Sequence, residues 1–149
     1  MILIITYLLF LLIIFSGLLL LSYNLGSFLP FLEGFELIFR CILIGGIGGV
    51  LYCIRGIYLN YSVKDQWDDR WIPWYYIRPI ASLVMGGISL VFLKAGLILL
   101  DANANQGTTE FGFLAIAFIA GLNVDNFVKK IEDIAQSSFG IGKSNTSRE

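Results

Sequence analysis

The sequence predicts an all-α protein, a polytopic membrane bundle of four transmembrane helices with a short interfacial segment and a C-terminal amphipathic helix. Two features of its composition support this prediction. Apolar residues make up 57% of the 149 residues, and charged residues only 14%, whereas soluble domains carry about 25% charged residues. The charged residues are also gathered between long apolar runs. We therefore exclude an ordinary soluble domain and expect one transmembrane domain over residues 1–139.

The first apolar run, 2–22, contains no charged residue and is long enough to cross a hydrocarbon core of about 30 Å. It lacks the basic start and the cleavage site of a signal peptide, so we expect a permanent first helix. Its residues are Leu, Ile and Phe nearly all round. Lipid offers no hydrophobic drive to bury them, so we expect this helix on the lipid-facing outside of the bundle.

The second and third apolar runs, 37–54 and 80–100, also predict transmembrane helices. Pro79 stands directly before the third run. Proline is tolerated at the first position of a helix, so we expect the third helix to begin there.

The fourth run is shorter, since residues 111–122 would reach only about 18 Å as a helix. We expect a short span over 108–122, with a re-entrant segment as the alternative. Asn123 is a suitable N-cap for a following helix over 124–139. Its apolar residues share one face and Gly140 ends it, which leaves a flexible polar tail over 140–149. The residues of that face are Val124, Phe127, Val128, Ile131, Ile134, Ala135 and Ser138.

The connecting segments differ in the sign of their charge. Segments 23–36 and 101–110 carry acidic residues and no basic ones, whereas segment 55–78 and the C-terminal segment are rich in Lys and Arg. The positive-inside rule therefore predicts a cell (inner) membrane protein with the 55–78 loop and both termini in the cytoplasm. The outer acids form a candidate vestibule that would attract cations: Glu33, Glu36, Asp101 and Glu110.

Three basic residues lie at or near membrane depth, namely Arg40, Arg55 and Lys94. Snorkelling or structural pairing explains such residues, and lining of a water path is the alternative. Glu36 and Arg40 are four residues apart on one helix, so we expect them to form an ion pair.

Small residues recur at four-residue spacing in the second, third and fourth helices. Such pairs let helix backbones approach closely, which predicts a close-packed core within or between subunits. A flexible hinge or a backbone-lined pore is the functional alternative for the glycine-rich part of the second helix. The pairs are Gly45 and Gly49, Ser82 and Gly86, and Ala117 and Gly121.

The three tryptophans, Trp67, Trp71 and Trp74, fall on one face of a helix. We expect a short interfacial helix that breaks near Pro73 and anchors the 55–78 loop at headgroup depth. A lipid-headgroup or partner site is the alternative, and it would use the basic residues Lys64, Arg70 and Arg78.

Several kinds of chemistry lack their residues in this sequence. The chain has no histidine, and its cysteines, Cys41 and Cys53, are too far apart on one helix to be bridged. No phosphate loop or serine elbow occurs, and no carboxylate pair lies at a spacing that demands acid–base catalysis, so we expect no enzyme, no metal site and no cofactor. The net charge of −1 gives no reason to expect binding to nucleic acid.

Three motifs suggest a resemblance over residues 74–139. Trp74-Tyr75-Tyr76-Ile77-Arg78-Pro79 leads into a glycine-interrupted span with Lys94-Ala95-Gly96-Leu97. Gly112-Phe113-Leu114-Ala115 begins a run to Gly121-Leu122, and Phe127-Val128-Lys129-Lys130-Ile131-Glu132 follows. Together they resemble small uncharacterised bacterial membrane proteins with four helices. The resemblance implies an Arg-Pro helix entrance and a short last span that leads into an amphipathic helix, and it implies no activity.

Two functions remain open from the sequence. The first is a homo-oligomeric channel or pore that prefers cations, because a protomer with small-residue faces and almost no extramembrane domain gains most by packing against copies of itself. The second is a non-conducting accessory or anchoring subunit of a larger membrane complex. That subunit would bind its partner through the 55–78 loop or the 124–139 helix.

Overall fold

The computed structural model describes residues 1–23, 35–64, 67–95 and 109–140, and these residues are helical apart from short connections. The prediction of an all-α fold is confirmed. A π-helical turn continues α3, and a 3₁₀ turn leads into α4. The elements are α1 (Ile2–Ser22), α3 (Glu36–Ile57), η2 (Tyr58–Val63), η3 (Asp69–Trp71), α4 (Ile72–Lys94), α5 (Thr109–Leu122) and α6 (Val124–Phe139).

Three segments of the described chain are long and apolar enough to cross a membrane: Ile2–Ser22, Glu36–Val63 and Asp69–Lys94. α5 and α6 meet the same criteria only as a pair, and a bend of 109° separates them. The structure therefore supports a membrane location with three candidate spans. In place of the expected fourth span it has a short helix followed by a sharp change of direction.

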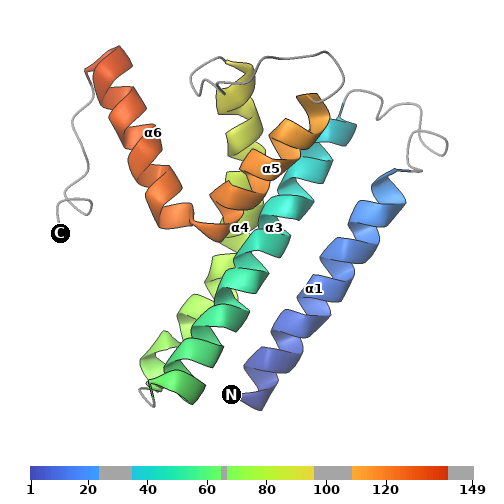
Figure 1. Cartoon of the computed structure of the whole chain (residues 1–149), viewed down its shortest axis with the longest axis vertical. Helices are drawn as coiled ribbons and strands as arrows, with labels where there is room; N and C mark the ends of the chain where they lie inside the picture. The colour runs from blue at the N-terminus through green and yellow to red at the C-terminus, as the bar shows by residue number, and fades with distance from the viewer. Residues whose placement is uncertain (24–34, 65–66, 96–108, 141–149) are drawn as a thin grey trace.

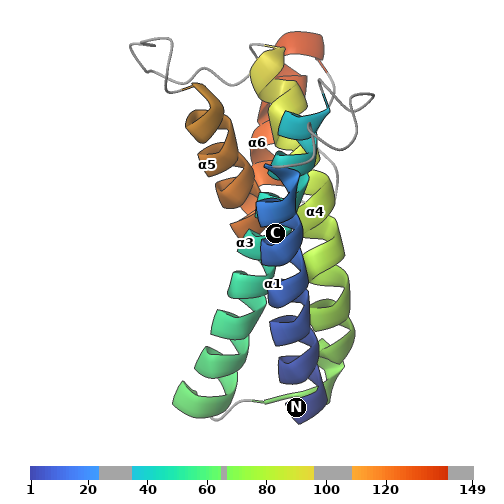
Figure 2. The same ribbon diagram turned by 90° about the vertical axis from the view of Figure 1, so that its right-hand side faces the viewer.

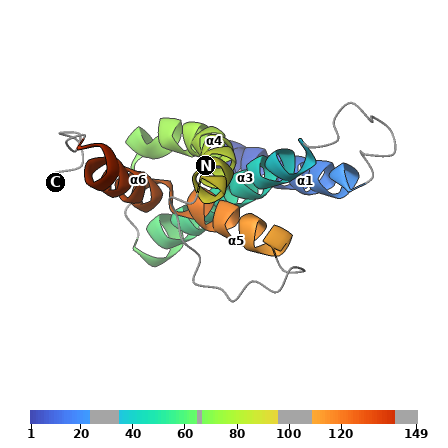
Figure 3. The same cartoon turned by 90° about the horizontal axis from the view of Figure 1, so that it is seen from above.

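α3 is the central helix and packs against α1, α4 and α5 (Figures 1 and 2). α5 lies along only the upper half of α3, as drawn in Figure 1, and α6 turns back toward the end at which α5 begins. Seen from above, α1 and α6 lie at opposite ends of an elongated cross-section, with the other helices between them (Figure 3).

The prediction that the third helix begins at Pro79 is wrong. α4 begins at Ile72, with Pro73 in its first turn and Pro79 in its interior. Proline is favoured in the first turn because its missing N–H has no partner there in any helix. An interior proline is tolerated in a membrane bundle because ending the helix in lipid would leave more backbone groups unpaired. α4 ends at Lys94, and the expected end at residue 100 lies outside the described residues.

The expected 55–78 loop is also mostly helical. The second helix continues past residue 54 through η2 to Val63, so only a short connection precedes Asp69. The tryptophans do not share one helix face, because Trp67 precedes the helix, Trp71 lies in η3 and Trp74 lies in α4. Pro73 lies in the first turn of α4 and does not interrupt a helix. The expected helix face with all three tryptophans therefore does not form.

The other helix boundaries agree more closely with prediction. Asn123 is the N-cap residue of α6, although its side chain makes no capping hydrogen bond. Gly140 ends α6 with φ of 68°, a left-handed conformation that suits glycine, and its N–H donates to the carbonyl of Gln136. Residues 141–149 of the expected polar tail lie outside the described residues.

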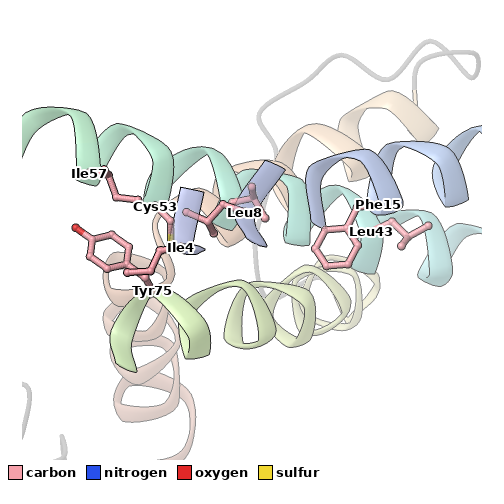
Figure 4. Packing of buried hydrophobic residues seen from close by; sticks show 8 residues of the cluster. Ile4, Leu8, Phe15, Leu43, Cys53, Ile57 and Tyr75 are labelled. Carbon is pink, nitrogen blue, oxygen red and sulfur yellow. The ribbon is translucent and has the colours of Figure 1, made fainter. Parts of the chain in front are cut away.

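α1 joins the bundle through one stripe of side chains and exposes the rest of its surface, as expected for a lipid-facing helix. Ile4, Leu8 and Phe15 are buried against α3, together with Tyr75 of α4 at the lower end (Figure 4). The packing partners on α3 include Leu43, Cys53 and Ile57. Van der Waals packing, rather than exclusion of water, therefore holds α1 in place in lipid.

α3, α4 and α5 approach one another so closely that Gly45 and Gly121 have no room for a side chain. A Cβ on Gly45 would lie 2.6 Å from the Cα of Gly86, and a Cβ on Gly121 would overlap the carbonyl oxygen of Gly45. Ser82 crosses the same contact, since its hydroxyl donates to the carbonyl of Gly121 at 2.9 Å. That carbonyl lies in the last turn of α5, where the helix itself supplies no donor. Small residues of all three helices thus pack together within one chain.

We expect Gly121→Ala to destabilise the protein by about 1–3 kcal/mol, because the new methyl group forces the backbones of α3 and α5 apart. Thermal unfolding in detergent, followed by tryptophan fluorescence, measures the change. Gly17→Ala is the matched control, since a Cβ on Gly17 meets nothing within 4 Å. Equal unfolding temperatures for the two variants would contradict the close approach.

Candidate functional site

Two buried arginines of the bundle are paired with acidic residues of α5 and α6. The first, Arg40 of α3, is 9% exposed. Its Nη1 donates to Glu110 at 2.5 Å, and its Nη2 donates to Glu36 at 3.1 Å and to the carbonyl of Ser22 at 3.4 Å. The guanidinium also lies 4.3 Å from the centre of the Tyr23 ring. The predicted pair between Glu36 and Arg40 is confirmed, and the cluster joins α1, α3 and α5.

Helix geometry explains why these groups meet. Glu36 and Arg40 are one turn apart on α3, so their side chains lie on one face. Glu110 lies in the first turn of α5, where the helix dipole favours a negative charge. Arg40 therefore has two carboxylate partners, both near the start of a helix.

The second arginine, Arg78 of α4, is fully buried, with 0% of its surface exposed. Its Nη1 donates to Asp125 at 2.7 Å, and Asp125 lies in the first turn of α6. The guanidinium lies 4.5 Å from the centre of the Tyr52 ring and 5.1 Å from that of Trp74. Among the described residues, its Nε and Nη2 have no hydrogen-bond partner. A buried charged donor without a partner is costly, so this side chain is only partly satisfied by the protein.

The two ion pairs hold α5 at both of its ends. Glu110 at the start of the helix is bound to α3, and Asp125, just beyond its end, is bound to α4. α6 makes few other contacts with the bundle. Its position therefore depends on the Arg78–Asp125 pair and on the packing of Val124, the buried residue of its first turn.

The structure brings together only part of the predicted outer acidic vestibule. Glu36 and Glu110 meet, but they do so around Arg40, which offsets one of their charges. Glu33 and Asp101 lie outside the described residues.

The other predicted site residues are spread through the fold. Arg55 and Lys94 are exposed near opposite ends of the bundle, so the three membrane-depth charges form no single cluster. Of the tryptophans, Trp67 packs on Tyr75 with its ring centre 5.8 Å away, and Trp71 and Trp74 are exposed. The small residues Gly45, Gly49, Ser82, Gly86, Ala117 and Gly121 all lie in the helix contacts.

Arg78 and Asp125 were missed as a pair by reasoning from the sequence. Placing the start of the third helix at Pro79 put Arg78 in a polar loop, where a basic residue needs no partner. The signal was the apolar character of the residues from Ile72 to Ile80, among which Arg78 is the one charged residue; inside an apolar helix such a residue demands a counter-charge. Nothing in the sequence selects Asp125 over the other acids as that counter-charge.

Two hollows lie beside these clusters. An apolar groove of about 500 Å³ runs between α1, α3 and α5, lined by residues such as Leu19, Ile47 and Phe118. A pocket of about 340 Å³ with a mixed polar and apolar lining lies between the lower ends of α3 and α4. Among the described residues, no three potential ligands are close enough to hold a metal ion, and both cysteines are free.

No family model, curated protein or solved structure matches this chain.

We expect Asp125→Asn to destabilise the protein by about 1–3 kcal/mol, because it leaves the charge of Arg78 buried without a counter-charge. Glu110→Gln is the matched comparison, and we expect a loss below about 1 kcal/mol because Arg40 keeps Glu36. Thermal unfolding of both variants in the same detergent measures the difference. A larger loss of stability for Glu110→Gln than for Asp125→Asn would contradict the view that Arg78 depends on its one carboxylate more than Arg40 depends on either of its two.

Proposed function

We propose that the chain is a subunit of a homo-oligomeric membrane channel in which the α5–α6 hairpin lines a hydrated path. The observation that supports this most directly is the depth at which α6 begins. A Cβ on Gly48, halfway along α3, would lie 2.9 Å from the backbone nitrogen of Leu122, so α5 ends near the middle of the bundle. The chain then bends by 109° and continues as a helix with a charged face.

The charges of α6 make lipid an unsuitable surrounding for it. Asp125, Lys129 and Lys130 are exposed in the single chain, and α6 starts beside a buried residue of α4. Ionisable residues at membrane depth face a protein interior or a water-filled cavity, because exposure to hydrocarbon costs several kcal/mol each. A ring of copies that turn this face inward would give these charges water and create a path through the assembly.

The hairpin geometry favours the re-entrant alternative over a fourth full span. α5 enters from the end that carries Glu36 and Glu110, and α6 returns toward the same end (Figure 1). The protomer would then have three full spans and one hairpin. The acids at the mouth of the hairpin support a preference for cations, although Arg40 offsets part of their charge.

The small-residue contacts bear on how copies would meet. Gly45, Gly86 and Gly121 are used inside the chain, so they are not free to join protomers. Contacts between copies would instead use the outer faces, including the apolar groove between α1 and α5.

The second candidate function is a non-conducting accessory or anchoring subunit of a larger membrane complex. The observation that favours it is α6 itself, which is amphipathic and makes few contacts with its own bundle. Partly buried residues such as Phe127, Ile131 and Ile134 would pack against the partner, as amphipathic helices do in helix-binding grooves.

Topology mapping separates the re-entrant arrangement from a fourth span. Reporter tags placed before Ile2 and after Gly140 are expected on opposite sides of the membrane if α5–α6 is a hairpin. Protease protection of sealed vesicles reads out each tag. Tags on the same side would instead support four spans, with both termini in the cytoplasm as the basic tail predicts.

Ion flux into liposomes that contain the purified full chain tests the channel. We expect flux of potassium and sodium above that of chloride, and we expect Glu110→Gln to reduce this preference, because the mouth then loses one negative charge while Arg40 keeps Glu36 as its partner. Gly17→Ala is the control for insertion and folding, since it changes an open surface of α1. Absence of flux from correctly inserted protein, with an unrelated subunit copurifying, would favour the accessory subunit.

A further inference from the structure

The pocket between the lower ends of α3 and α4 is built from polar and aromatic groups. Its volume is about 340 Å³, and Asn60 from η2 supplies an amide at its wall. Tyr52 and Gly56 of α3 line it on one side, and Trp71, Trp74 and Tyr75 line it on the other. It opens near the end of two candidate spans, where Trp and Tyr are typical of the membrane interface.

Arg78 does not itself line this pocket, but it is buried directly behind two of the rings that do. Its guanidinium packs on Tyr52 and Trp74, two of the rings that line the pocket. Trp74 precedes Arg78 by one helical turn, so the arginine side chain points back toward the start of α4, where the pocket lies. Both rings are more than one third exposed, and among the described residues they alone are known to separate the guanidinium from the pocket lining.

The donors of Arg78 are in excess of what the protein satisfies. Nη1 binds Asp125, but Nε and Nη2 are buried without a hydrogen-bond partner in the described part of the chain. Asp125 is 60% exposed, so water screens its charge more strongly than that of the arginine. A planar guanidinium with free N–H groups suits the oxygen atoms of a phosphate, which accept such donors in pairs.

The surroundings favour an anion that comes from the bilayer. Arg55 and Arg70 directly precede the lining residues Gly56 and Trp71 in sequence, and both are exposed. Arg70 lies 3.9 Å from Asp68, which offsets part of its charge, so Arg55 is the basic residue here without an acidic partner in the described part of the chain. Basic residues at this depth attract anionic headgroups, while the neighbouring apolar surface of α3 and α4 accommodates acyl chains.

We propose that this pocket binds the phosphate-bearing headgroup of an anionic phospholipid, with the free donors of Arg78 as its innermost contact. The bound lipid would complete the hydrogen bonds of a buried arginine that the chain itself leaves open. It would also tie the Arg78–Asp125 pair, and through it α6, to the composition of the membrane.

Native mass spectrometry of the purified full chain in a non-ionic, phosphate-free detergent tests this proposal. Dioleoyl phosphatidylglycerol is the probe, and dioleoylglycerol, which lacks the phosphate, is the control lipid. We expect one phosphatidylglycerol to remain bound per chain and at least tenfold weaker binding of dioleoylglycerol. Inorganic phosphate is added as a competitor, and displacement of the lipid by millimolar phosphate would overturn the assignment to a headgroup.

Two pairs of variants locate the site. Gly56→Leu fills the pocket without touching the ion pair, since a Cβ on Gly56 meets only the Tyr75 ring, at 3.4 Å from its Oη. Gly17→Leu places the same side chain on an open face of α1. Arg78→Lys keeps the buried charge with fewer donors, and Arg40→Lys is its control, because it makes the same exchange at the other buried arginine, away from this pocket.

We expect Gly56→Leu and Arg78→Lys to weaken phosphatidylglycerol binding at least tenfold and both controls to bind as the wild type does. If Arg78→Lys does not fold, Gly56→Leu alone decides. Unchanged binding by folded Gly56→Leu would overturn the proposal.

Discussion

The contact of three glycines, Gly45, Gly86 and Gly121, is the constraint on which the rest of the structure depends. Lipid gives no hydrophobic reward for helix association, so the helices must gain their stability from close packing. A side chain at any of these positions would hold the backbones apart. Because α3 carries the shared glycine, α4 and α5 are both placed by it, and the hydrogen bond from Ser82 to the last turn of α5 becomes possible.

The two arginine clusters follow from that placement. Once α5 lies against α3, Glu110 reaches Arg40, and the residue that follows the bend reaches Arg78. The two clusters differ in how well they are satisfied. Arg40 has two carboxylates and a carbonyl and leaves only its Nε without a hydrogen-bond partner among the described residues, whereas Arg78 has one carboxylate and leaves both Nε and Nη2 without one. The Arg40 cluster fixes the start of α5 through Glu110. The Arg78–Asp125 pair fixes the start of α6, directly after the bend.

Sequence reasoning succeeded where a periodic signal repeated along a helix. The apolar runs predicted the candidate spans, and the pair of Glu36 and Arg40 followed from one turn of spacing. Sequence reasoning failed where one residue type is compatible with two different local structures. Pro79 can begin a helix or lie within one, and the choice depends on neighbours that lie far away in the chain. The partner of Arg78 depends on the bend after α5, for which the short length of the last apolar run gave only an indirect indication.

The shortness of α5 also has a consequence for the lipids around the protein. α1, α3 and α4 extend through the whole bundle, whereas α5 and α6 occupy only the half that carries Glu110 (Figure 1). With these three candidate spans across the bilayer and the proposed hairpin in one half of it, the protein would take up more area in one leaflet than in the other, like a wedge. A wedge-shaped protein relieves packing stress in a curved bilayer and creates it in a flat one. Such a protein would therefore be enriched in membrane regions whose curvature matches its shape.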